Sequence, residues 1–494
     1  MRFKKDWTYD LKIQNAKMKI WVFAFVLGFL FTPAGAEDLM QIPGVIHVHT
    51  IFSSGEYSLE ALVNIAKEKG IEVLIPTDHD LVVMEYGIFP LRNIIKKRVE
   101  NKSIINLGPE NYLNAITQIN KNQKRVLVIP GVQSSPFYYW TGSPFNKDLT
   151  ANNYRKELIL IGMMKADDYM NLPLMHRESP KKINSTYLPR FIIFIISLLL
   201  GVFLSFQKGS YRFFGFGVVF LSLIMLINHH PYRSSRFDPY YGDKGIQPFQ
   251  DVIDYVDQRK GLVFWTHPES QYAAGGVKMG PITLQTRPYP EALLESKDYT
   301  GFSGLYGDRT TAETPGNLWD QALLEYCEGK REKPVWVIAE SDFHKKKSQG
   351  GAVHFDTFQT IFLAKNKRMQ TIINSLASGK VYALRKSGNV RLSLDRFQVG
   401  SKGHKVLANM GEKLNTPSEP EIHIRISASD KGTYPIKISL IKRGRIFRHL
   451  DEETPFETKI LDEDTWEGIS FYRLEVEGRP GKILSNPIFV SREQ

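Results

Sequence analysis

Residues 44–50 read Gly-Val-Ile-His-Val-His-Thr: a short apolar run of β-type, Val45-Ile46, followed at once by His47 and His49. In an extended segment, residues two apart point the same way, so both imidazoles lie on one face and can grip a single cation. A β-rich run followed by polar residues recurs along the chain, and this recurrence decides the fold.

Short β-rich runs alternate with segments of helical spacing between about residues 43 and 385. The predicted strands cover residues 45–46, 72–76, 125–129, 158–161, 261–265, 302–306 and 335–339. The predicted helices cover residues 59–69, 110–122, 248–260 and 318–328, with Ser58 as the first N-cap and Gly70 after that helix. This alternation predicts an α/β fold of parallel strands and crossover helices, and seven such strands can close a small barrel.

Histidine and aspartate follow four of the predicted strands: His47 and His49 the first, Asp78-His79-Asp80 the second, His267 the fifth, and Asp342 and His344 the seventh. In α/β barrels, ligands gather where the C-terminal ends of strands converge. Imidazole with carboxylate suits zinc, manganese or iron. Each motif alone has an ordinary explanation, such as a capping turn, but their joint placement favours one shared polar or metal site.

The length, composition, net charge and cysteine count limit the possible domain number, partners and metal ligands. A chain of 494 residues with 42% apolar and 23% charged residues is globular and long enough for two or three domains. The net charge of +12 is spread without a basic block, which suits an anionic small substrate or an anionic lipid surface. No nucleic-acid motif accompanies it, so no nucleic-acid partner is expected. The single cysteine, Cys327, excludes an intramolecular disulfide and a cysteine-based zinc site.

Residues 1–36 are typical of an export signal or an N-terminal anchor. Basic residues precede an apolar run over 20–31, and Ala34-Gly35-Ala36 offers a small-x-small cleavage site. An uncleaved anchor is the alternative. In either case the rest of the chain is expected on the periplasmic or extracytoplasmic side.

Two further apolar runs, 191–206 and 213–227, are separated by a short polar turn and predict a membrane helical hairpin over residues 191–228. A buried helical pair or an oligomer contact is the alternative. A hairpin returns the chain to its starting side, so residues 37–190 and 229–388 can form one barrel in two parts. The basic residues flanking the hairpin argue for the opposite sidedness from the signal.

Residues 389–494 change pattern. The segments 421–427, 435–441 and 471–476 alternate like half-buried strands and are separated by Gly, Pro, Asp and Asn. They predict a small all-β sandwich, structural or adhesive rather than catalytic.

The motifs resemble those of the polymerase-and-histidinol-phosphatase (PHP) superfamily of metal-dependent hydrolases. The matching stretches, in order, are His47-Val48-His49-Thr50, Thr77-Asp78-His79-Asp80, Pro130-Gly131-Val132, Thr266-His267-Pro268 and Ser341-Asp342-Phe343-His344. The resemblance implies a distorted seven-stranded β/α barrel holding up to three metal ions. The ending, Tyr472-Arg473-Leu474-Glu475-Val476 and Ser485-Asn486-Pro487-Ile488, resembles the carbaryl-hydrolase-like branch, which carries a C-terminal β-sandwich.

The resemblance also implies ligand sets. His47, His49 and Asp342 match the ligands of a first metal, His79 and His344 those of another, and His267 a ligand of the remaining one. The metal-bridging glutamate is Gln133 here, an expected aspartate is Ser54, and the histidine of the fourth strand corresponds to Ile159. A neutral amide can coordinate but cannot offset the repulsion of two dications, so we expect one to two divalent ions (Zn, Mn or Fe), with a weak site near Gln133.

Two functions follow from these residues. The first is a membrane-attached hydrolase of phosphoesters or related esters, in which water activated by the metal is the nucleophile and His47, His49, His79, Asp342 and His344 carry the reaction. The second is a catalytically degenerate protein that serves as an envelope binding or scaffold module with at most one structural metal. A nucleic-acid enzyme is a third, less favoured reading.

Overall fold

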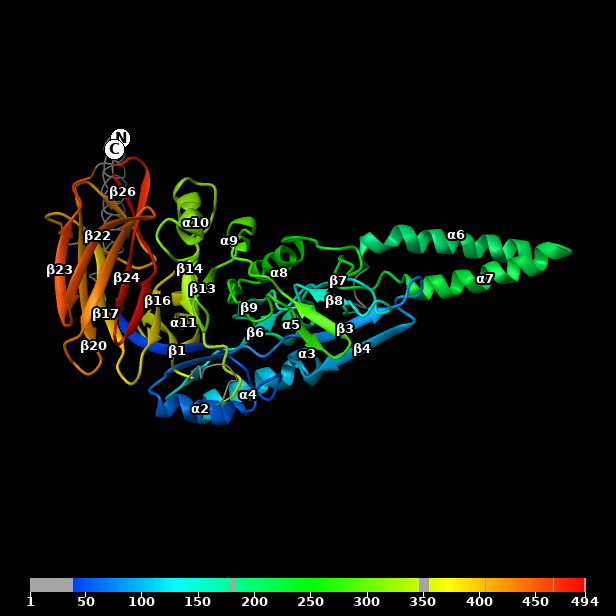
Figure 1. The fold of residues 1–494 in the computed structure, drawn as a ribbon, viewed down its shortest axis with the longest axis horizontal. Coiled ribbons are helices and arrows are strands. Elements are labelled where there is room, and N and C mark those ends of the chain that lie inside the picture. The colour runs from blue at the N-terminus through cyan, green and yellow to red at the C-terminus, as the bar shows by residue number, and fades with distance from the viewer. Residues whose placement is uncertain (1–38, 178–182, 346–354, 405, 465, 493–494) are drawn as a thin grey trace, which may run out of the picture. The chain divides into compact units, whose positions relative to one another are not determined.

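The computed structural model describes residues 39–177, 183–345, 355–404, 406–464 and 466–492. These residues form a mixed α/β fold (Figure 1), as the sequence predicts. The segment predicted as an export signal, residues 1–36, lies outside the described residues.

Eight strands support the candidate site: β1 (Met40–Val48), β2 (Val73–Pro76), β5 (Leu127–Val128), β6 (Gly131–Ser134), β9 (Leu158–Ile161), β10 (Leu262–Trp265), β13 (Gly301–Leu305) and β14 (Trp336–Ala339). Parallel pairing links β1 to β2 and β2 to β5, and a parallel bridge between His79 and Gln133 extends it to β6. β6, β9, β10, β13 and β14 follow in one sheet. Ser341 N then donates to Ile46 O at 3.0 Å, so the backbone pairing returns from the end of β14 to β1.

β9 departs from the predicted topology, because it pairs antiparallel with both β6 and β10. Residues 135–157, which precede it, form the short strands β7 (Tyr139–Thr141) and β8 (Thr150–Asn152) and contain no crossover helix. The chain therefore enters β9 from the opposite end. As a consequence, the residue before β9 lies with the carboxyl ends of the neighbouring strands.

The four predicted helices are confirmed as α2 (Leu59–Glu68), α4 (Pro109–Asn122), α8 (Gln247–Asp257) and α10 (Leu318–Cys327). At the start of α2 the Ser58 hydroxyl accepts a hydrogen bond from Ala61 N at 3.2 Å, and Gly70 after its end has φ 69°, as expected of an N-cap and a helix-ending glycine. Shorter helices are α3 (Ile104–Leu107), α5 (Ala166–Met170), η1 (Ser185–Tyr187), α9 (Ala292–Glu295) and α11 (Met369–Ala377).

The strands of the site are apolar on both faces. Val45, Leu74 and Val337 pack in one cluster with residues of the four helices. The alternate positions, Ile46, Ile75 and Ile338, pack in a second cluster with residues of α11. Strands buried on both faces hold their ends rigidly, which favours a precisely placed site there.

The remaining strands of the first part are β3 (Val82–Gly87), β4 (Lys96–Asn101), β11 (Val277–Met279), β12 (Ile282–Gln285), β15 (Phe358–Ala364) and β16 (Val381–Lys386). β3 and β4 form a two-stranded ribbon. β15 pairs with β1 and β16 with β15, and β16 in turn pairs with β25 (Gly481–Ser485) of the C-terminal part.

The described residues from 389 to 492 contain strands and no helix: β17 (Leu392–Ser401), β18 (Leu407–Asn409), β19 (Lys413–Thr416), β20 (Pro420–Ala428), β21 (Pro435–Lys442), β22 (Arg445–Glu453), β23 (Phe456–Leu461), β24 (Ile469–Gly478), β25 (Gly481–Ser485) and β26 (Ile488–Arg492). The predicted strands in this part are confirmed. Six of the strands continue the sheet of β1, β15 and β16, and the other four form a separate sheet.

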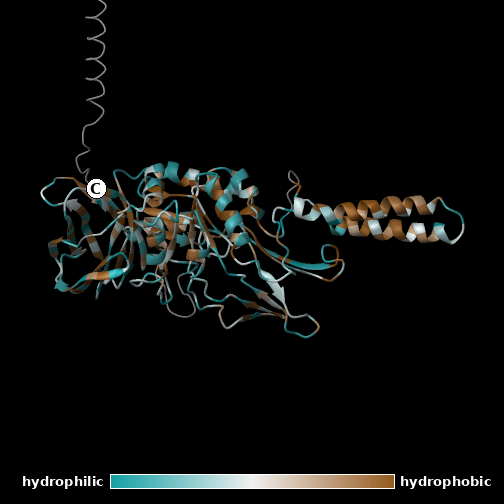
Figure 2. Cartoon of the chain, turned by 90° about the horizontal axis from the view of Figure 1, so that it is seen from above, coloured by the Kyte–Doolittle hydropathy of each residue, from teal (hydrophilic) through white to brown (hydrophobic). Residues whose placement is uncertain are grey.

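The two apolar runs form antiparallel helices, α6 (Leu188–Ser205) and α7 (Ser210–Asn228), which lie side by side (Figures 1 and 2). Their contact uses small and polar residues: Gly201 and Gly215 are buried, and Ser222 Oγ donates to Ser197 Oγ at 2.9 Å. Large apolar side chains such as Leu199 and Phe220 are exposed. Figure 2 shows that hydrophobic residues run along both helices. By length and composition, both helices can cross a membrane.

Candidate metal centre

Three of the predicted ligands have a left-handed backbone: His47 (φ 69°), His267 (φ 30°) and Asp342 (φ 45°). Residues with a side chain avoid this region, and those that adopt it are held there by their surroundings, often at functional sites. At His47 the pairing of β1 with β2 shifts register between Ile46 and Val48. This bulge, rather than simple alternation along a strand, sets the rings of His47 and His49 5.2 Å apart.

Asp342 lies against both of these imidazoles. Its Oδ1 is 3.3 Å from His47 Nε2 and 3.5 Å from His49 Nε2. Both Nε2 atoms are buried and have no hydrogen-bond partner within the described part of the chain. An unpartnered buried nitrogen is costly, and one divalent cation held by these three residues would satisfy both. Three protein ligands with an open position also match the pattern of catalytic zinc.

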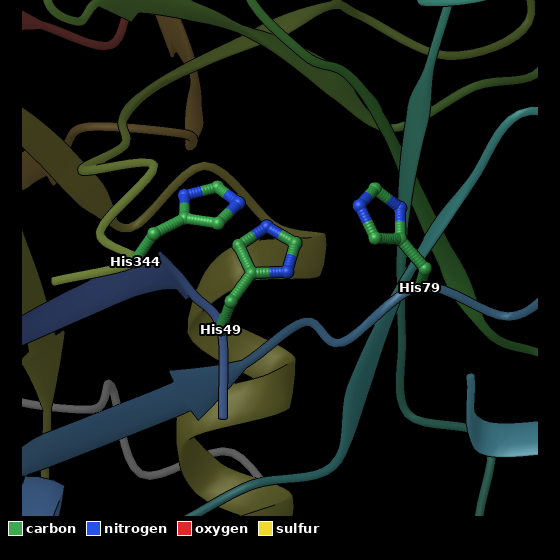
Figure 3. A group of neighbouring side chains, drawn as sticks. All are labelled: His49, His79 and His344. Carbon is green, nitrogen blue, oxygen red and sulfur yellow. The ribbon is translucent and has the colours of Figure 1, made fainter. Parts of the chain in front are cut away.

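A second group consists of three imidazoles, His49, His79 and His344, from three different segments (Figure 3). The ring of His49 stacks on that of His344 at 4.0 Å and lies 4.9 Å from that of His79. Burial lowers the pKa of His79 to about 4. Burial, together with the nearby His344, lowers the pKa of His49 well below its ordinary value. Both are therefore neutral near pH 7, the form that binds a cation.

Glu340 is a buried residue at the site to which the sequence analysis assigns no role. Its carboxylate lies 2.8 Å from His47 Nδ1 and 3.0 Å from His267 Nδ1, and Thr266 Oγ1 donates to it at 2.7 Å. Burial alone would raise its pKa, but the positive charges that His47 and His267 can carry lower it below its ordinary value. A carboxylate on Nδ1 leaves Nε2 of the imidazole for a metal. The only sign in the sequence that Glu340 belongs to the site is its position directly before Ser341-Asp342.

Glu157, which precedes β9, is the second residue that sequence reasoning missed. It accepts hydrogen bonds from Gln133 Nε2 at 2.7 Å and Ser135 Oγ at 2.9 Å, and it lies 3.1 Å from His267 Nε2. Burial would raise its pKa, but the hydrogen bond and charge of His267 lower it to about 2.

His267 is thus held between two carboxylates. Burial would lower its pKa, but hydrogen bonds to Glu157 and Glu340 and their charges raise it well above its ordinary value. In the absence of a cation, His267 therefore holds a proton near neutral pH.

The structure places Ile159 away from the candidate site. This side chain is fully buried among apolar residues, in register with Gln133 on one side and Phe264 on the other. Because β9 runs antiparallel, Glu157 rather than Ile159 reaches the site. Its carboxylate, which accepts a hydrogen bond from Gln133, supplies negative charge where the neutral Gln133 supplies none. Gln133 Oε1 is buried and has no hydrogen-bond partner within the described residues, so it is oriented as a neutral ligand would be.

The two aspartates beside His79 have separate surroundings. Asp78 accepts hydrogen bonds from Thr50 N (2.8 Å), Thr50 Oγ1 (2.7 Å) and Ser53 Oγ (2.6 Å) and so fixes the loop after His49. Asp80 is buried and accepts a hydrogen bond from Leu81 N at 2.6 Å. Asp78 therefore supports the loop after His49, and neither aspartate belongs to a group of possible ligand atoms within the described residues.

The described residues contain three groups in which all possible ligand atoms lie within 4.8 Å of one another. The groups are His49, His79 and His344; His47, His49 and Asp342; and His47, His267 and Glu340. Neighbouring groups share an imidazole. A neutral imidazole offers one lone pair, so adjacent groups cannot both be filled. The geometry can therefore hold one cation in the middle group, or two in the outer groups.

A cavity of about 420 Å³ adjoins these groups. Its lining includes His79 and Glu157 from the candidate centre, the predicted site position Ser54, and two basic side chains, Lys102 and Arg155. Basic groups beside a candidate metal site suit an anionic ligand.

No protein-family model and no curated protein matches this chain. Its fold is similar to three solved structures at low identity. A two-domain protein from Bacteroides vulgatus containing a predicted PHP-like metal-dependent phosphoesterase has TM-score 0.35 and 12% identity, over 90% of this chain and 92% of that one.

A protein from Bifidobacterium adolescentis proposed to be a metal-dependent phosphoesterase has TM-score 0.27 and 12% identity, over 63% of this chain and 90% of that one. An amidohydrolase from Chromobacterium violaceum, solved with bound sulfate and no metal, has TM-score 0.26 and 13% identity, over 61% of this chain and 87% of that one. At these scores none of the three assigns a function to this chain.

Proposed function

We propose that this protein is a membrane-attached, metal-dependent hydrolase of phosphoesters or related esters. The observation that supports it most is the pair of buried, unpartnered Nε2 atoms of His47 and His49, both facing the Asp342 carboxylate. A divalent cation bound there would polarise the ester and lower the pKa of a water molecule to about 7.

Other residues orient a metal ligand, hold a proton and attract an anionic substrate. Glu340 holds His47 through Nδ1, which keeps Nε2 directed toward Asp342. His267 lies between Glu340 and Glu157, 3.1 Å from the latter, and would be placed to give a proton to a leaving oxygen if it keeps that proton when a cation is bound. Arg155 and Lys102, which line the adjoining cavity, would orient an anionic phosphoryl group.

The degenerate alternative is favoured by one observation, the neutral Gln133 at the position of the bridging carboxylate. In that case the protein would be an envelope binding or scaffold module with at most one structural metal. The two proposals differ in turnover rather than in metal content alone.

Metal analysis and turnover test the proposal together. The full-length protein, purified in detergent, is analysed for bound zinc, manganese and iron, then assayed on phosphoester and carboxylester panels with added Zn²⁺ or Mn²⁺. His47→Ala with His49→Ala should abolish both metal binding and hydrolysis. His449→Ala, an exposed histidine on β22, is the matched control and should change neither. Metal binding without turnover would favour the scaffold alternative, and unchanged turnover in the double variant would exclude this site.

Export of the catalytic part is also proposed, on the sequence of residues 1–36 and the return of the chain by the hairpin. A membrane-impermeant thiol reagent tests it on two single-cysteine variants in cells. With Cys327 replaced by serine, Glu60→Cys on the exposed surface of α2 should be labelled from outside, and Lys208→Cys in the hairpin turn should be protected.

A further inference from the structure

A cavity of about 570 Å³ lies where the hairpin joins the rest of the protein. Its walls come from the first turn of α6, the last turn of α7, the β3–β4 ribbon and the segment 229–241. Figure 1 shows the ribbon and the bases of both helices in this region. The cavity lies apart from the three candidate ligand groups and shares only Leu81, Met175 and His176 with the lining of the smaller cavity beside them.

The cavity has an excess of positive charge. Six basic side chains line it, against three acidic ones: Arg92, Lys96, Arg98, Arg177, Arg190 and Arg233, against Glu85, Glu100 and Asp238. Lys96 and Arg98 form ion pairs with Glu85 at 2.9 and 3.3 Å. Within the described part of the chain, no carboxylate lies within 4.0 Å of the basic groups of Arg92, Arg177, Arg190 or Arg233.

Aromatic rings, rather than carboxylates, position three of these guanidiniums. Arg92 lies over the Tyr240 ring at 4.0 Å, Arg190 over Tyr241 at 5.5 Å and Arg233 over Tyr187 at 4.7 Å. Stacking uses the flat face of a guanidinium and leaves its N–H edge for an oxyanion. Arg92 Nε is in addition buried and has no hydrogen-bond partner among the described residues.

The position of the cavity identifies the kind of anion. Arg190 belongs to the first turn of α6, and Met225 and Asn228 of the last turns of α7 also line the cavity. Beyond them, both helices expose apolar side chains to their surroundings, among them Ile192, Ile193 and Ile227. In a membrane, the phosphates of phospholipids lie at this level, just outside the apolar segment. A free phosphate would need no apolar surface beside its site.

We propose that the cavity at the base of the hairpin binds the phosphate of an anionic membrane phospholipid, with Arg92, Arg190 and Arg233 as its main partners. The acyl chains would lie along the apolar surface of α6 and α7. The site is independent of hydrolysis and rests on the placement of the hairpin in a membrane.

Native mass spectrometry of the full-length protein in a neutral detergent tests the proposal. The probes are short-chain phosphatidylglycerol, phosphatidylcholine of the same chain length, and inorganic phosphate. We expect phosphatidylglycerol to bind at one saturable site, and phosphatidylcholine and inorganic phosphate each to bind more weakly by roughly tenfold or more. Equal binding of phosphatidylcholine, or displacement of the lipid by inorganic phosphate at equal concentration, would overturn it.

Variants locate the site. Arg92→Ala with Arg233→Ala should weaken phosphatidylglycerol binding by roughly tenfold or more, because hydrogen bonds to a charged group are lost. Arg190→Gln, a change at an exposed side chain, should weaken it in the same direction and covers the case in which the double variant fails to fold. Arg236→Ala is the matched control. Arg236 lies in the same segment as Arg233 but outside the cavity, paired with Asp251 at 2.8 Å, and its loss should leave lipid binding unchanged. If Arg190→Gln and a correctly folded double variant both bind phosphatidylglycerol as the native protein does, the lipid binds elsewhere.

Discussion

Glu340 determines which nitrogen of His47 faces Asp342. Its carboxylate lies 2.8 Å from Nδ1, on the side of the ring opposite Asp342, and both Glu340 and His47 are fully buried. A buried carboxylate in this position fixes the tautomer and the orientation of a metal ligand. The quality of the site therefore depends on residues behind the ligands as much as on the ligands themselves.

Replacing Glu340 by glutamine should weaken metal binding by about 10–100-fold, because the amide can no longer accept from His47 Nδ1 with full charge. Isothermal titration of the metal-free protein with Zn²⁺ or Mn²⁺ measures the change. Glu60→Gln, at an exposed position on α2, is the control and should bind as the native protein does. An unchanged affinity in Glu340→Gln would contradict the role given to Glu340 in orienting His47.

Gln133→Glu should make stability more dependent on metal. Gln133 Nε2 now donates to Glu157 at 2.7 Å, and a glutamate there would set two carboxylates against each other. Without metal the repulsion should lower the melting temperature. With Zn²⁺ or Mn²⁺ the added charge should stabilise a second cation, so that the metal-induced rise in melting temperature exceeds that of the native protein. Gln133→Met, which adds no charge, should show no such gain, and equal rises in all three proteins would contradict the prediction.

At the scale of elements, one buried ion pair joins the C-terminal strands to a helix of the first part. Arg473 on β24 contacts Asp320 on α10 at 2.6 Å, and both side chains are fully buried. The Arg473 guanidinium also lies over the Trp319 ring at 4.6 Å and donates to Glu313 O at 2.9 Å. The pair fixes the position of α10 relative to β24.

Arg473→Met should cost about 3–5 kcal/mol of unfolding free energy, because it leaves the Asp320 carboxylate buried without a countercharge, with a hydrogen bond from Gly316 N at 2.8 Å remaining. Chemical unfolding in detergent, followed by tryptophan fluorescence, measures the loss. Adding Asp320→Leu should recover most of it, since an apolar pair of similar volume carries no desolvation penalty. A double variant as unstable as the single one would show that packing, not charge, is what Arg473 contributes.

The β3–β4 ribbon has an ionic contact that should make its stability depend on pH. Burial alone would raise the pKa of Glu85, but His176, whose Nδ1 is 3.6 Å away, and Lys96, at 2.9 Å, lower it to about 2. A lowered folded-state pKa contributes stability that is full above the ordinary value near 4.5 and is lost as the pH falls toward 2. The melting temperature of Glu85→Gln should therefore lie below that of the native protein at pH 7, and the difference should shrink between pH 4.5 and pH 3. Glu100→Gln, which changes a more exposed carboxylate on β4, should show a smaller effect at all of these pH values.

At the scale of the whole molecule, the hairpin is an insertion whose two ends meet. Asn184 N donates to Pro231 O at 2.9 Å, and the rings of Phe194 and His229 stack 5.3 Å apart. The segment between them contributes no residue to the three candidate ligand groups. Its removal should therefore leave the rest of the fold intact.

Replacing residues 191–226 by a short Gly-Ser linker should give a protein that keeps its metal affinity but binds membranes more weakly, because the apolar surface of both helices is lost. Expression without residues 1–36, followed by fractionation and metal titration, measures both properties. The same deletion carried out on the chain with an intact N-terminus is the control, since the sequence of that segment predicts a signal or an anchor. Loss of metal binding in the shortened protein would show that the hairpin supports the site.

Much of the architecture could be predicted from local patterns. Four amphipathic helices, the cap at Ser58 and the strands of the first part follow from periodicity and capping residues, which act over a few neighbouring positions. The same is true of His47, His49 and Asp342, whose positions directly after strands predict that they meet. Whether these residues bind a cation and catalyse hydrolysis stays a prediction.

The reversed direction of β9 has no local signature, because a strand of four apolar residues reads the same in either orientation. The paths of the chain before and after β9 set its direction. That direction places Glu157, rather than Ile159, at the site. For the same reason Glu340 and the arginines at the hairpin base could not be assigned from sequence: the partners of a buried charge are distant in the chain, 293 residues apart for His47 and Glu340. The sequence by itself determined the elements and the histidines at their ends, through interactions between near neighbours, and the tertiary structure decided which carboxylates surround them, because long-range packing sets those distances.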